Sequence, residues 1–471
     1  MQKFKFYFII ILAFAILNGR SFSQNIPKKI DIDGNWLGTL NVSTIQLRIV
    51  FHIKKTGEEY SATLDSPDQG AKDIPTSKVS FDGNRLEIDV PVIQGTYSGR
   101  YYADSSFFNG MWSQGGNSLP LNLVKTNKDI EINRPQEPKK PYPYNEEEVT
   151  FENKSAGDVL SGTFTFPKKG KKFTTVLLIP GSGPHNRNEE ILGHKPFLVI
   201  SDYLTRHGIA VLRYDDRGVG KSTGYYPSAT SKDLASDAAA AVLYLKSRKD
   251  VDKIGLIGHS EGGIIAPMVA NQSKNVSFII LMAAPGIPCD QILLQQAYLI
   301  GKGAGESDST LEITKRLNEK IYNIIKENKD SIIAAQKLEK AASNFYEKSS
   351  PQFKQSLGSK ENFLSQLKPV LSPWFRYFIK YDPRPALEKV KCPVLAIDGS
   401  KDVQVPPKED LAAIKKALTE GGNKKIKVVD FEGLNHLFQT AKSGLPSEYN
   451  KISETISPKV LELISNWILE Q

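Results

Sequence analysis

A serine with glycines two positions away on either side stands out within residues 253–270, KIGLIGHSEGGIIAPMVA. Gly258-His259-Ser260-Glu261-Gly262 matches G-x-S-x-G, the turn that presents a serine hydroxyl for attack on a carbonyl carbon. The pattern is short, and an idle serine in a glycine turn is the alternative. Context favours a nucleophile, because an apolar, strand-like run precedes Ser260 and an apolar helical segment follows it.

A serine hydroxyl needs a base to become a nucleophile, and histidine is the usual one. The chain has six histidines: His52, His185, His194, His207, His259 and His436. His52 lies in a β-rich part, His207 ends a helix before an early strand, and His259 cannot easily turn back to Ser260. His436, in FEGLNHLF, follows the last expected strand, so its loop opens on the sheet edge that carries Ser260. We expect His436 to be the base; a solvent-exposed or capping histidine is the alternative.

A carboxylate must orient the base and select its tautomer. Asp402, in DGSKDVQVPP, follows another strand and reaches the same edge. The chain order Ser260, Asp402, His436 is the order found in α/β-hydrolases. Asp290, which follows the preceding strand, is the alternative acid.

Acyl transfer also requires two N–H donors for the developing oxyanion. The backbone N–H of Glu261, directly after the serine, is one expected donor. The second is expected in PGSGPHNRNE, where glycines let backbone amides approach a ligand, and we choose Ser182 N–H. The alternative for this segment is a turn with no catalytic role.

A second glycine-rich segment, DDRGVGKST at residues 215–223, ends like a phosphate-binding loop. That motif needs glycine five positions before Gly220, but Asp215 stands there and would repel phosphate. We expect a structural turn that Asp216 and Arg217 hold together.

These residues would be placed by a mostly parallel sheet of the α/β class. Six apolar runs of strand length recur after residue 173: TTVLLIPG, IAVLRYD, KIGLIGHS, SFIILMAA, PVLAIDGS and KIKVVDFEG. Such continuous apolar runs are typical of strands buried on both faces. Helices are expected at residues 196–207, 232–248, 263–272 and 457–469. The charged, helical insertion at about 286–390 is expected to form a cap over the carboxyl edge, with its charges in solvent.

Residues 24–125 form a different region, with about eight short alternating segments separated by turns. This spacing predicts a small antiparallel barrel or sandwich, and DGN at residues 82–84 predicts a hairpin. A ligand-binding interior and a compact protein-contact module both remain open. Residues 126–145 are polar, contain four prolines and are interpreted as a linker.

The amino terminus has the layout of a cleavable secretory signal, residues 1–23. Two lysines precede a 12-residue apolar run at residues 6–17, which is short of the about 20 residues that cross a bilayer. We expect a secreted or periplasmic protein without stable membrane insertion; an uncleaved anchor is the alternative. Removal of residues 1–23 would lower the formal charge from +9 to +6. Without a basic block, nucleic-acid binding is not expected.

The sequence shows no metal-ligand motif and needs no cofactor for the expected chemistry. C-x-x-C and H-E-x-x-H are absent from the 471 residues. The two cysteines, Cys289 and Cys392, should lie at opposite ends of neighbouring parallel strands. We expect two free, buried thiols rather than a disulfide.

From about residue 146 to the end, the chain resembles α/β-hydrolases of the exported bacterial carboxylesterase and serine-aminopeptidase-like group. The segments that carry this resemblance are PGSGPHNRNE, RYDDRGVGKST, GLIGHSEGG, SPWFRYFIKYDP, LAIDGSKDVQVPP and GLNHLF. The resemblance implies an α/β-hydrolase fold with a helical cap, and activity on short or medium acyl esters. It places the family's catalytic roles on Ser260, Asp402 and His436, with backbone donors at Ser182 and Glu261. The β region departs from the family pattern.

We therefore expect a secreted serine carboxylic-ester hydrolase that acts on a small-molecule ester through an acyl-enzyme. An aminopeptidase or other amidase with the same triad is the first alternative. It would need an acidic site for a substrate ammonium, for which Glu261, Glu189 and Glu190 are candidates. A non-enzymatic binding protein with a hydrolase scaffold is the second. The partner of the β region stays open.

Overall fold

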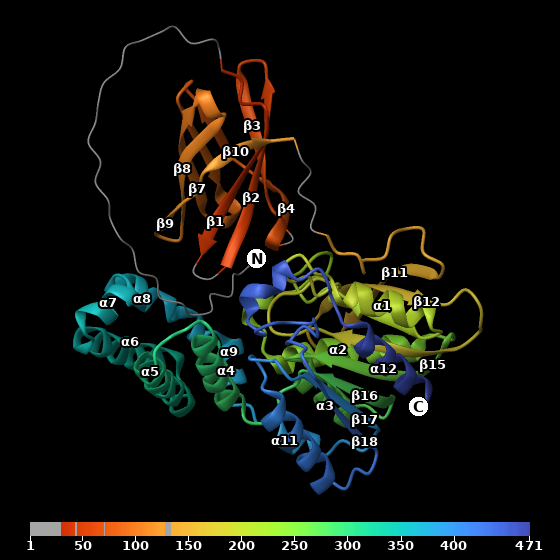
Figure 1. Cartoon of the computed structure of the whole chain (residues 1–471). Coiled ribbons are helices and arrows are strands. Elements are labelled where there is room, and N and C mark those ends of the chain that lie inside the picture. Colours follow the sequence, from red (N-terminus) through yellow and green to blue (C-terminus); the bar gives the residue numbers. More distant parts are fainter. Residues whose placement is uncertain (1–29, 43–44, 70, 128–132) are drawn as a thin grey trace, which may run out of the picture.

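The computed structural model describes residues 30–471 except 43–44, 70 and 128–132. The expected signal segment, residues 1–23, lies outside the described residues. Two separate sheets organise the chain (Figure 1). A ten-stranded sheet comes first, and an eight-stranded sheet covered by helices follows it. Among the described residues, no helix is both long and apolar enough to cross a bilayer.

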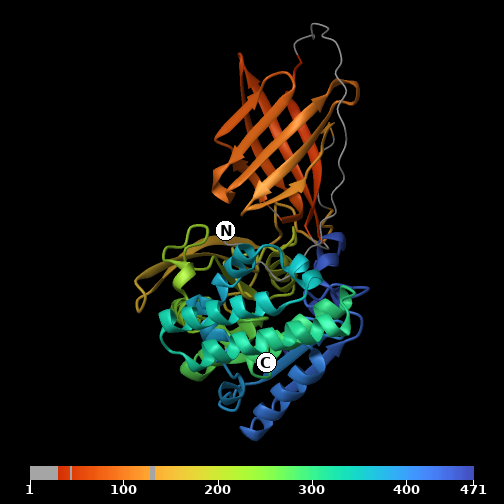
Figure 2. The same ribbon diagram turned by 90° about the vertical axis from the view of Figure 1, so that its left-hand side faces the viewer.

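The first sheet is antiparallel throughout, as predicted, and wraps into a barrel-like shape (Figure 2). Its strands are β1 Gly34–Val42, β2 Ile45–Thr56, β3 Glu59–Ser66, β4 Ala71–Pro75, β5 Lys78–Phe81, β6 Arg85–Val90, β7 Gly95–Tyr102, β8 Phe107–Gln114, β9 Asn117–Pro120 and β10 Leu123–Thr126. Their order is β4-β3-β2-β1-β10-β8-β7-β6-β5, with β9 paired to β8. The predicted hairpin joins β5 to β6, and Asp82 Oδ1 accepts from the backbone N–H groups of Asn84 and Arg85.

Aromatic side chains fill the interior of this first sheet. Trp36, Phe51, Tyr97 and Phe108 are each at most 1% exposed. The Tyr97 ring occupies space that side chains at Gly99 and Gly110 would need, since a Cβ at either glycine would overlap its phenol. This packing favours the compact module over the ligand-binding interior.

The second sheet has the order β11-β12-β14-β13-β15-β16-β17-β18. Its strands are β11 Asn145–Asn153, β12 Asp158–Phe166, β13 Phe173–Ile179, β14 Ala210–Tyr214, β15 Val251–His259, β16 Val276–Met282, β17 Val394–Gly399 and β18 Ile426–Phe431. The ladders β11·β12 and β12·β14 are antiparallel, and the other five are parallel. All six predicted apolar runs form strands. The result is the predicted α/β-hydrolase fold, with a mostly parallel central sheet.

Helices cover both faces of this sheet. α1 Pro196–Arg206 and α12 Pro458–Leu469 share one apolar core with it. α2 Ser231–Ser247, α3 Gly262–Gln272 and α11 Pro407–Glu420 share the core on the other face. Four of these helices were predicted, and α11 was not. Its buried Leu411, Ile414 and Leu418 recur at helical spacing, but charged residues between them hide the pattern.

The long insertion forms a helical cap beside the sheet, as predicted (Figures 1 and 2). Its helices are α4 Cys289–Gly303, α5 Asp308–Glu327, α6 Ser331–Lys348, α7 Pro351–Leu357, α8 Lys360–Gln366, α9 Pro373–Phe378 and α10 Arg384–Leu387. The cap has an apolar core of its own, which includes Ile325, Leu338 and Phe363. The cap therefore packs as a unit, and separate contacts attach it to the sheet.

The predicted linker is bound to the hydrolase over part of its length. Arg134 donates to the backbone carbonyls of Gly193, Leu192, Ile452 and Asn450 at 3.2, 3.2, 2.8 and 3.1 Å. Gln136 Oε1 accepts from Thr455 N at 2.6 Å, and its Nε2 donates to Ile456 O. The segment from Arg134 onward therefore differs from a free, solvated linker.

Candidate active site

Ser260 lies on a tight turn between β15 and α3. Its φ is +52°, in the left-handed region that non-glycine residues rarely adopt, and its N–H donates to Met282 O at 2.9 Å. A Cβ at Gly258 would overlap the backbone of Gly262, and one at Gly262 would overlap Ile179. Both glycines are therefore required by close backbone approach, and the turn holds Ser260 at the carboxyl end of its strand.

His436 and Asp402 form a buried pair. His436 Nδ1 donates to Asp402 Oδ2 at 2.6 Å. The other carboxylate oxygen, Oδ1, accepts from Gln404 N at 2.7 Å and Val405 N at 2.9 Å, so the aspartate is itself held in place. Because Nδ1 donates to a carboxylate, the neutral ring keeps its lone pair on Nε2.

The alternative acid and the other histidines are engaged elsewhere. Asp290 accepts from Lys326 Nζ at 2.6 Å within the cap. His52 contacts Asn35 and Asp65 in the first sheet, and His194 contacts Thr455 and Tyr449. Of the two acids considered, only Asp402 contacts His436.

His259, which directly precedes Ser260, contacts His436. His259 Nε2 lies 3.0 Å from His436 O, and the two imidazole centroids are 5.0 Å apart. In the described part of the chain, no hydrogen bond joins Ser260 Oγ directly to His436 Nε2. Such contacts are often loose before substrate binds.

The oxyanion loop, residues 181–183, lies against the serine, and its central amide is available. A Cβ at Gly181 would be 3.2 Å from Ser260 Cβ. Gly181 N donates to Glu189 Oε1 at 2.7 Å, and Gly183 N to Tyr226 Oη at 3.1 Å. Between them, Ser182 N–H has no acceptor among the described residues, and neither has Glu261 N–H. The two amides predicted from the sequence can therefore donate to a ligand.

The side chain of Glu261 has a role that the sequence did not indicate. It is 1% exposed and accepts from Ser231 Oγ at 2.5 Å. Trp374 Nε1, from cap helix α9, donates to its two oxygens at 2.8 and 2.9 Å. Burial raises the pKa of Glu261, although these donors and Ser182 act in the opposite direction. The carboxyl group thus joins the nucleophile turn to α2 and to the cap.

A further carboxyl group, Asp398 on β17, lies next to Asp402. Asp398 is fully buried, and its Oδ1 accepts from Gly399 N at 2.7 Å. Burial and the neighbouring Asp402 charge raise the pKa of Asp398 well above its ordinary value. Asp398 thus lies beside the carboxyl group that orients His436.

The segment DDRGVGKST is a structural turn, as expected. Asp216 Oδ2 accepts from His185 N at 2.9 Å, and Arg217 Nε donates to Asp237 Oδ2 at 2.7 Å. Asp215 pairs with Arg187 at 2.7 Å. The contacts of Asp215 and Asp216 bind the turn to the loop that contains Ser182, and the contact of Arg217 binds it to α2.

No group of three or more histidine, cysteine or acidic side chains among the described residues could hold a metal ion. Cys289 and Cys392 are free thiols, as expected. Cys289 is buried, but Cys392 is only half-buried, because it precedes the buried part of β17.

Three kinds of comparison place the chain among known proteins. A family model described as X-Pro dipeptidyl-peptidase (S15 family) matches residues 133–426. Esterase EstD of Thermotoga maritima is 27% identical over 314 residues, which span 66% of this chain and 66% of that protein. The Pf2001 esterase of Pyrococcus furiosus is 16% identical with a TM-score of 0.43, and covers 72% of this chain and 97% of its own. Est1E of Butyrivibrio proteoclasticus, solved with ferulic acid bound, is 20% identical with a TM-score of 0.42, and covers 69% and 98%.

Proposed function

The chain belongs to the X-Pro dipeptidyl-peptidase (S15) family of α/β-hydrolases, and from this membership and the site geometry we propose that it is a serine hydrolase of carboxylic esters. One observation carries the proposal. The strained turn at Ser260 lies between two unpaired amides, Ser182 N–H and Glu261 N–H, beside the His436–Asp402 pair. A nucleophile, a base with its acid and an oxyanion site are the parts that acyl transfer requires.

In the proposed reaction, Ser260 Oγ attacks the ester carbonyl while His436 Nε2 takes its proton. The carbonyl oxygen becomes an oxyanion, which accepts hydrogen bonds from Ser182 N–H and Glu261 N–H. Collapse expels the alcohol, which leaves with the proton from His436, and an acyl-enzyme remains. Water then attacks the acyl group by the same route and releases the acid. Asp402 stabilises the imidazolium form of His436 in both halves.

The described acidic groups near the site favour an ester over a peptide amine terminus. Glu261 is bound by Ser231 and Trp374, and Glu189 by His259 and Gly181. Glu190 Oε2 accepts from Asn186 Nδ2 at 3.2 Å. An aminopeptidase needs a carboxylate for the substrate ammonium, and each of the three candidates already has a protein partner. The related EstD is an esterase by name.

The family name keeps a peptidase as the second candidate, and substrate choice separates the two. The mature protein is assayed on p-nitrophenyl esters of increasing acyl length, and on alanyl-prolyl and aminoacyl p-nitroanilides. We expect ester turnover, with a loss of at least about 10⁴-fold in Ser260→Ala because the nucleophile is gone. Anilide turnover that exceeds ester turnover would assign a peptidase instead.

Export is a part of this proposal that rests on residues 1–23 alone. Cleavage of that segment would leave a mature chain beginning near Gln24. Sequencing the amino terminus of the protein from the periplasm or medium tests it. An intact Met1 on membrane-bound protein would contradict the proposal.

A further inference from the structure

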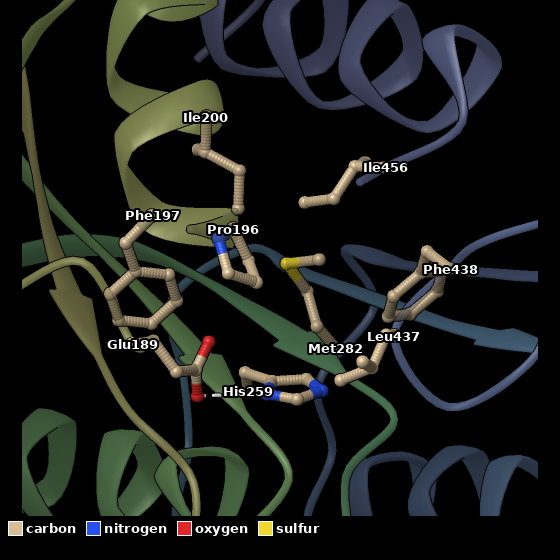
Figure 3. A pocket seen from close by; sticks show the side chains of 9 residues that line it. All are labelled: Glu189, Pro196, Phe197, Ile200, His259, Met282, Leu437, Phe438 and Ile456. Carbon is tan, nitrogen blue, oxygen red and sulfur yellow. Dashed lines mark hydrogen bonds and ion pairs between the residues drawn. The ribbon is translucent and has the colours of Figure 1, made fainter. Parts of the chain in front are cut away.

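A buried pair of side chains, His259 and Glu189, includes the residue that directly precedes the nucleophile. His259 and Glu189 are 7% and 3% exposed, and His259 Nδ1 is 2.9 Å from Glu189 Oε1. Figure 3 shows the two groups meeting at one end of a small apolar pocket between α1 and the loop after β18. The other lining side chains are Pro196, Phe197, Ile200, Met282, Leu437, Phe438 and Ile456. The pair therefore forms the polar end of an otherwise apolar pocket.

The partners of His259 determine its protonation. Nδ1 faces the Glu189 carboxylate and Nε2 faces the His436 carbonyl oxygen at 3.0 Å. Both partners are acceptors, so both ring nitrogens must donate, and the ring is an imidazolium. Burial opposes this charge, but Glu189 outweighs it and raises the pKa of His259. Burial likewise opposes the Glu189 charge, and His259 outweighs it and lowers the pKa of Glu189.

One oxygen of Glu189 makes two of the contacts. Oε1 accepts from Gly181 N at 2.7 Å as well as from His259. Gly181 begins the oxyanion loop, His259 precedes Ser260, and the His259 ring reaches the backbone of His436. The pair therefore connects the three segments that carry the oxyanion donor, the nucleophile and the base.

We propose that Glu189 and His259 are positioning residues, whose three hydrogen bonds set the oxyanion loop, Ser260 and His436 at the separation that acyl transfer needs. This inference rests on the proposed function, since it assigns a role within that reaction. Neither side chain touches the reacting atoms. We expect substitution of these residues to lower kcat, because a shift of about 1 Å between reacting groups can lower the rate about 10²-fold.

Other titratable groups around the pair are accounted for. His185 lies nearby, where its Nε2 donates to Ser182 O at 3.1 Å and burial lowers its pKa. Burial and nearby acids, Glu189 among them, raise the pKa of Asp216 well above its ordinary value. Asp402 adds a negative charge that favours the His259 cation. Glu189 and Asp402 are thus the anions that support the imidazolium.

Two substitutions at Glu189 separate hydrogen bonding from folding. In Glu189→Gln, the amide oxygen can take the place of Oε1 and accept from both Gly181 N and His259 Nδ1–H, so the two links that this atom makes survive without its charge. We therefore expect kcat within about threefold of wild type. Glu189→Ala removes two links, and we expect kcat to fall about 10- to 100-fold with KM changed less than about threefold.

The measurements are steady-state kcat and KM on a p-nitrophenyl ester, and the rate at which a fluorophosphonate labels Ser260. Ile200→Val, which trims the same pocket without touching a polar group, is the matched control and should keep wild-type kcat. Thermal melts verify that each variant is folded at the assay temperature, and Glu189→Gln provides the comparison if Glu189→Ala is unstable.

The outcomes distinguish this inference from the proposed function. If wild type hydrolyses no ester, the proposed function fails. If wild type is active and folded Glu189→Ala keeps its kcat, the positioning role alone is overturned. It is also overturned if Glu189→Gln loses as much kcat as Glu189→Ala, because the hydrogen-bond geometry would then not be what matters.

Discussion

Asp410 is a single buried carboxyl group at the point where the cap leaves the hydrolase sheet. It is fully buried on α11, and its Oδ1 accepts from Gly286 N at 2.6 Å and Ile287 N at 3.1 Å. Within the described chain its Oδ2 has no partner. Burial raises the pKa of Asp410 from 3.8 to about 7, although both backbone donors act against the rise.

This pKa predicts a stability change with pH. The folded-state pKa exceeds the unfolded one, so the native state binds the proton more tightly, and stability is lost as pH rises from about 4 to about 7. Asp410→Asn keeps the Oδ1 acceptor and cannot ionise. We expect the free energy of unfolding of Asp410→Asn, relative to wild type, to rise by about 2–3 kcal/mol between pH 5 and pH 8. Urea titrations at both pH values measure it, and an equal difference at both would refute the assignment.

The sequence predicts some residues of the site and misses others for a physical reason. Ser260, Asp402 and His436 each follow a recognisable strand, and parallel strands bring their carboxyl ends to one edge. The sequence indicates Glu189 only as a candidate ammonium site, and it assigns no role to His259. Their pairing depends on contacts across 70 residues of chain, and no local pattern encodes such contacts.

At the scale of elements, Trp374 attaches the cap to the nucleophile turn. It lies on α9, stacks on Phe378 at 5.1 Å, and donates to Glu261. Trp374→Phe keeps an aromatic ring and removes this donor. A hydrogen bond to a charged group contributes about 1.5–3 kcal/mol, so we expect a looser cap and a kcat/KM on longer esters that is about 10- to 100-fold lower.

Tyr346→Phe is the control for that prediction. It removes a hydrogen bond within the cap, from Tyr346 Oη to Gly358 O at 2.9 Å, that does not involve Glu261. Its kcat/KM should match wild type across the same ester series. If Trp374→Phe also matched wild type at every acyl length, the contact with Glu261 would hold the cap without affecting catalysis.

The sequence predicts a helix or strand correctly where its apolar residues form a clear, uninterrupted pattern. The strands of the second sheet are continuous apolar runs, because helices cover both faces, and each run was found. The sequence does not predict α11, because charged residues lie between its apolar ones and obscure the helical spacing. Pro407 in its first turn is the one local signal of a helix start. The insertion was predicted as helical, but how its helices pack follows from the core around Ile325 and Leu338, which one sequence does not reveal.

At the scale of the whole molecule, Arg134 connects the segment after the first sheet to the hydrolase. Its guanidinium reaches four backbone carbonyls in two loops, and burial lowers the pKa of Arg134 to about 10. Prolines and polar residues made this segment resemble a free linker. The polar composition of this segment predicts only that it is solvated. Its attachment depends on the Arg134 side chain, which donates to carbonyls more than 300 residues away, and no local pattern predicts that contact.

The position of these contacts predicts where the hydrolase can be shortened. A chain that begins at Asn133 keeps Arg134 and Gln136, and the family match also begins at residue 133. We expect this chain to fold and to retain ester hydrolysis, because the first sheet has its own core. A chain that begins at Asn145 leaves the four carbonyls and Thr455 N without these partners, and should be less stable by about 2–4 kcal/mol.

Urea unfolding of the two shortened chains, followed by tryptophan fluorescence, measures the difference. Arg134→Met in the chain that begins at Asn133 isolates the guanidinium, since methionine keeps an apolar stem without donors. It should account for most of the loss, because Arg134 makes four of the contacts. Equal stability of the two chains would show that residues 133–144 are a linker after all. Loss of activity in both would instead mean that the first sheet supports the active site.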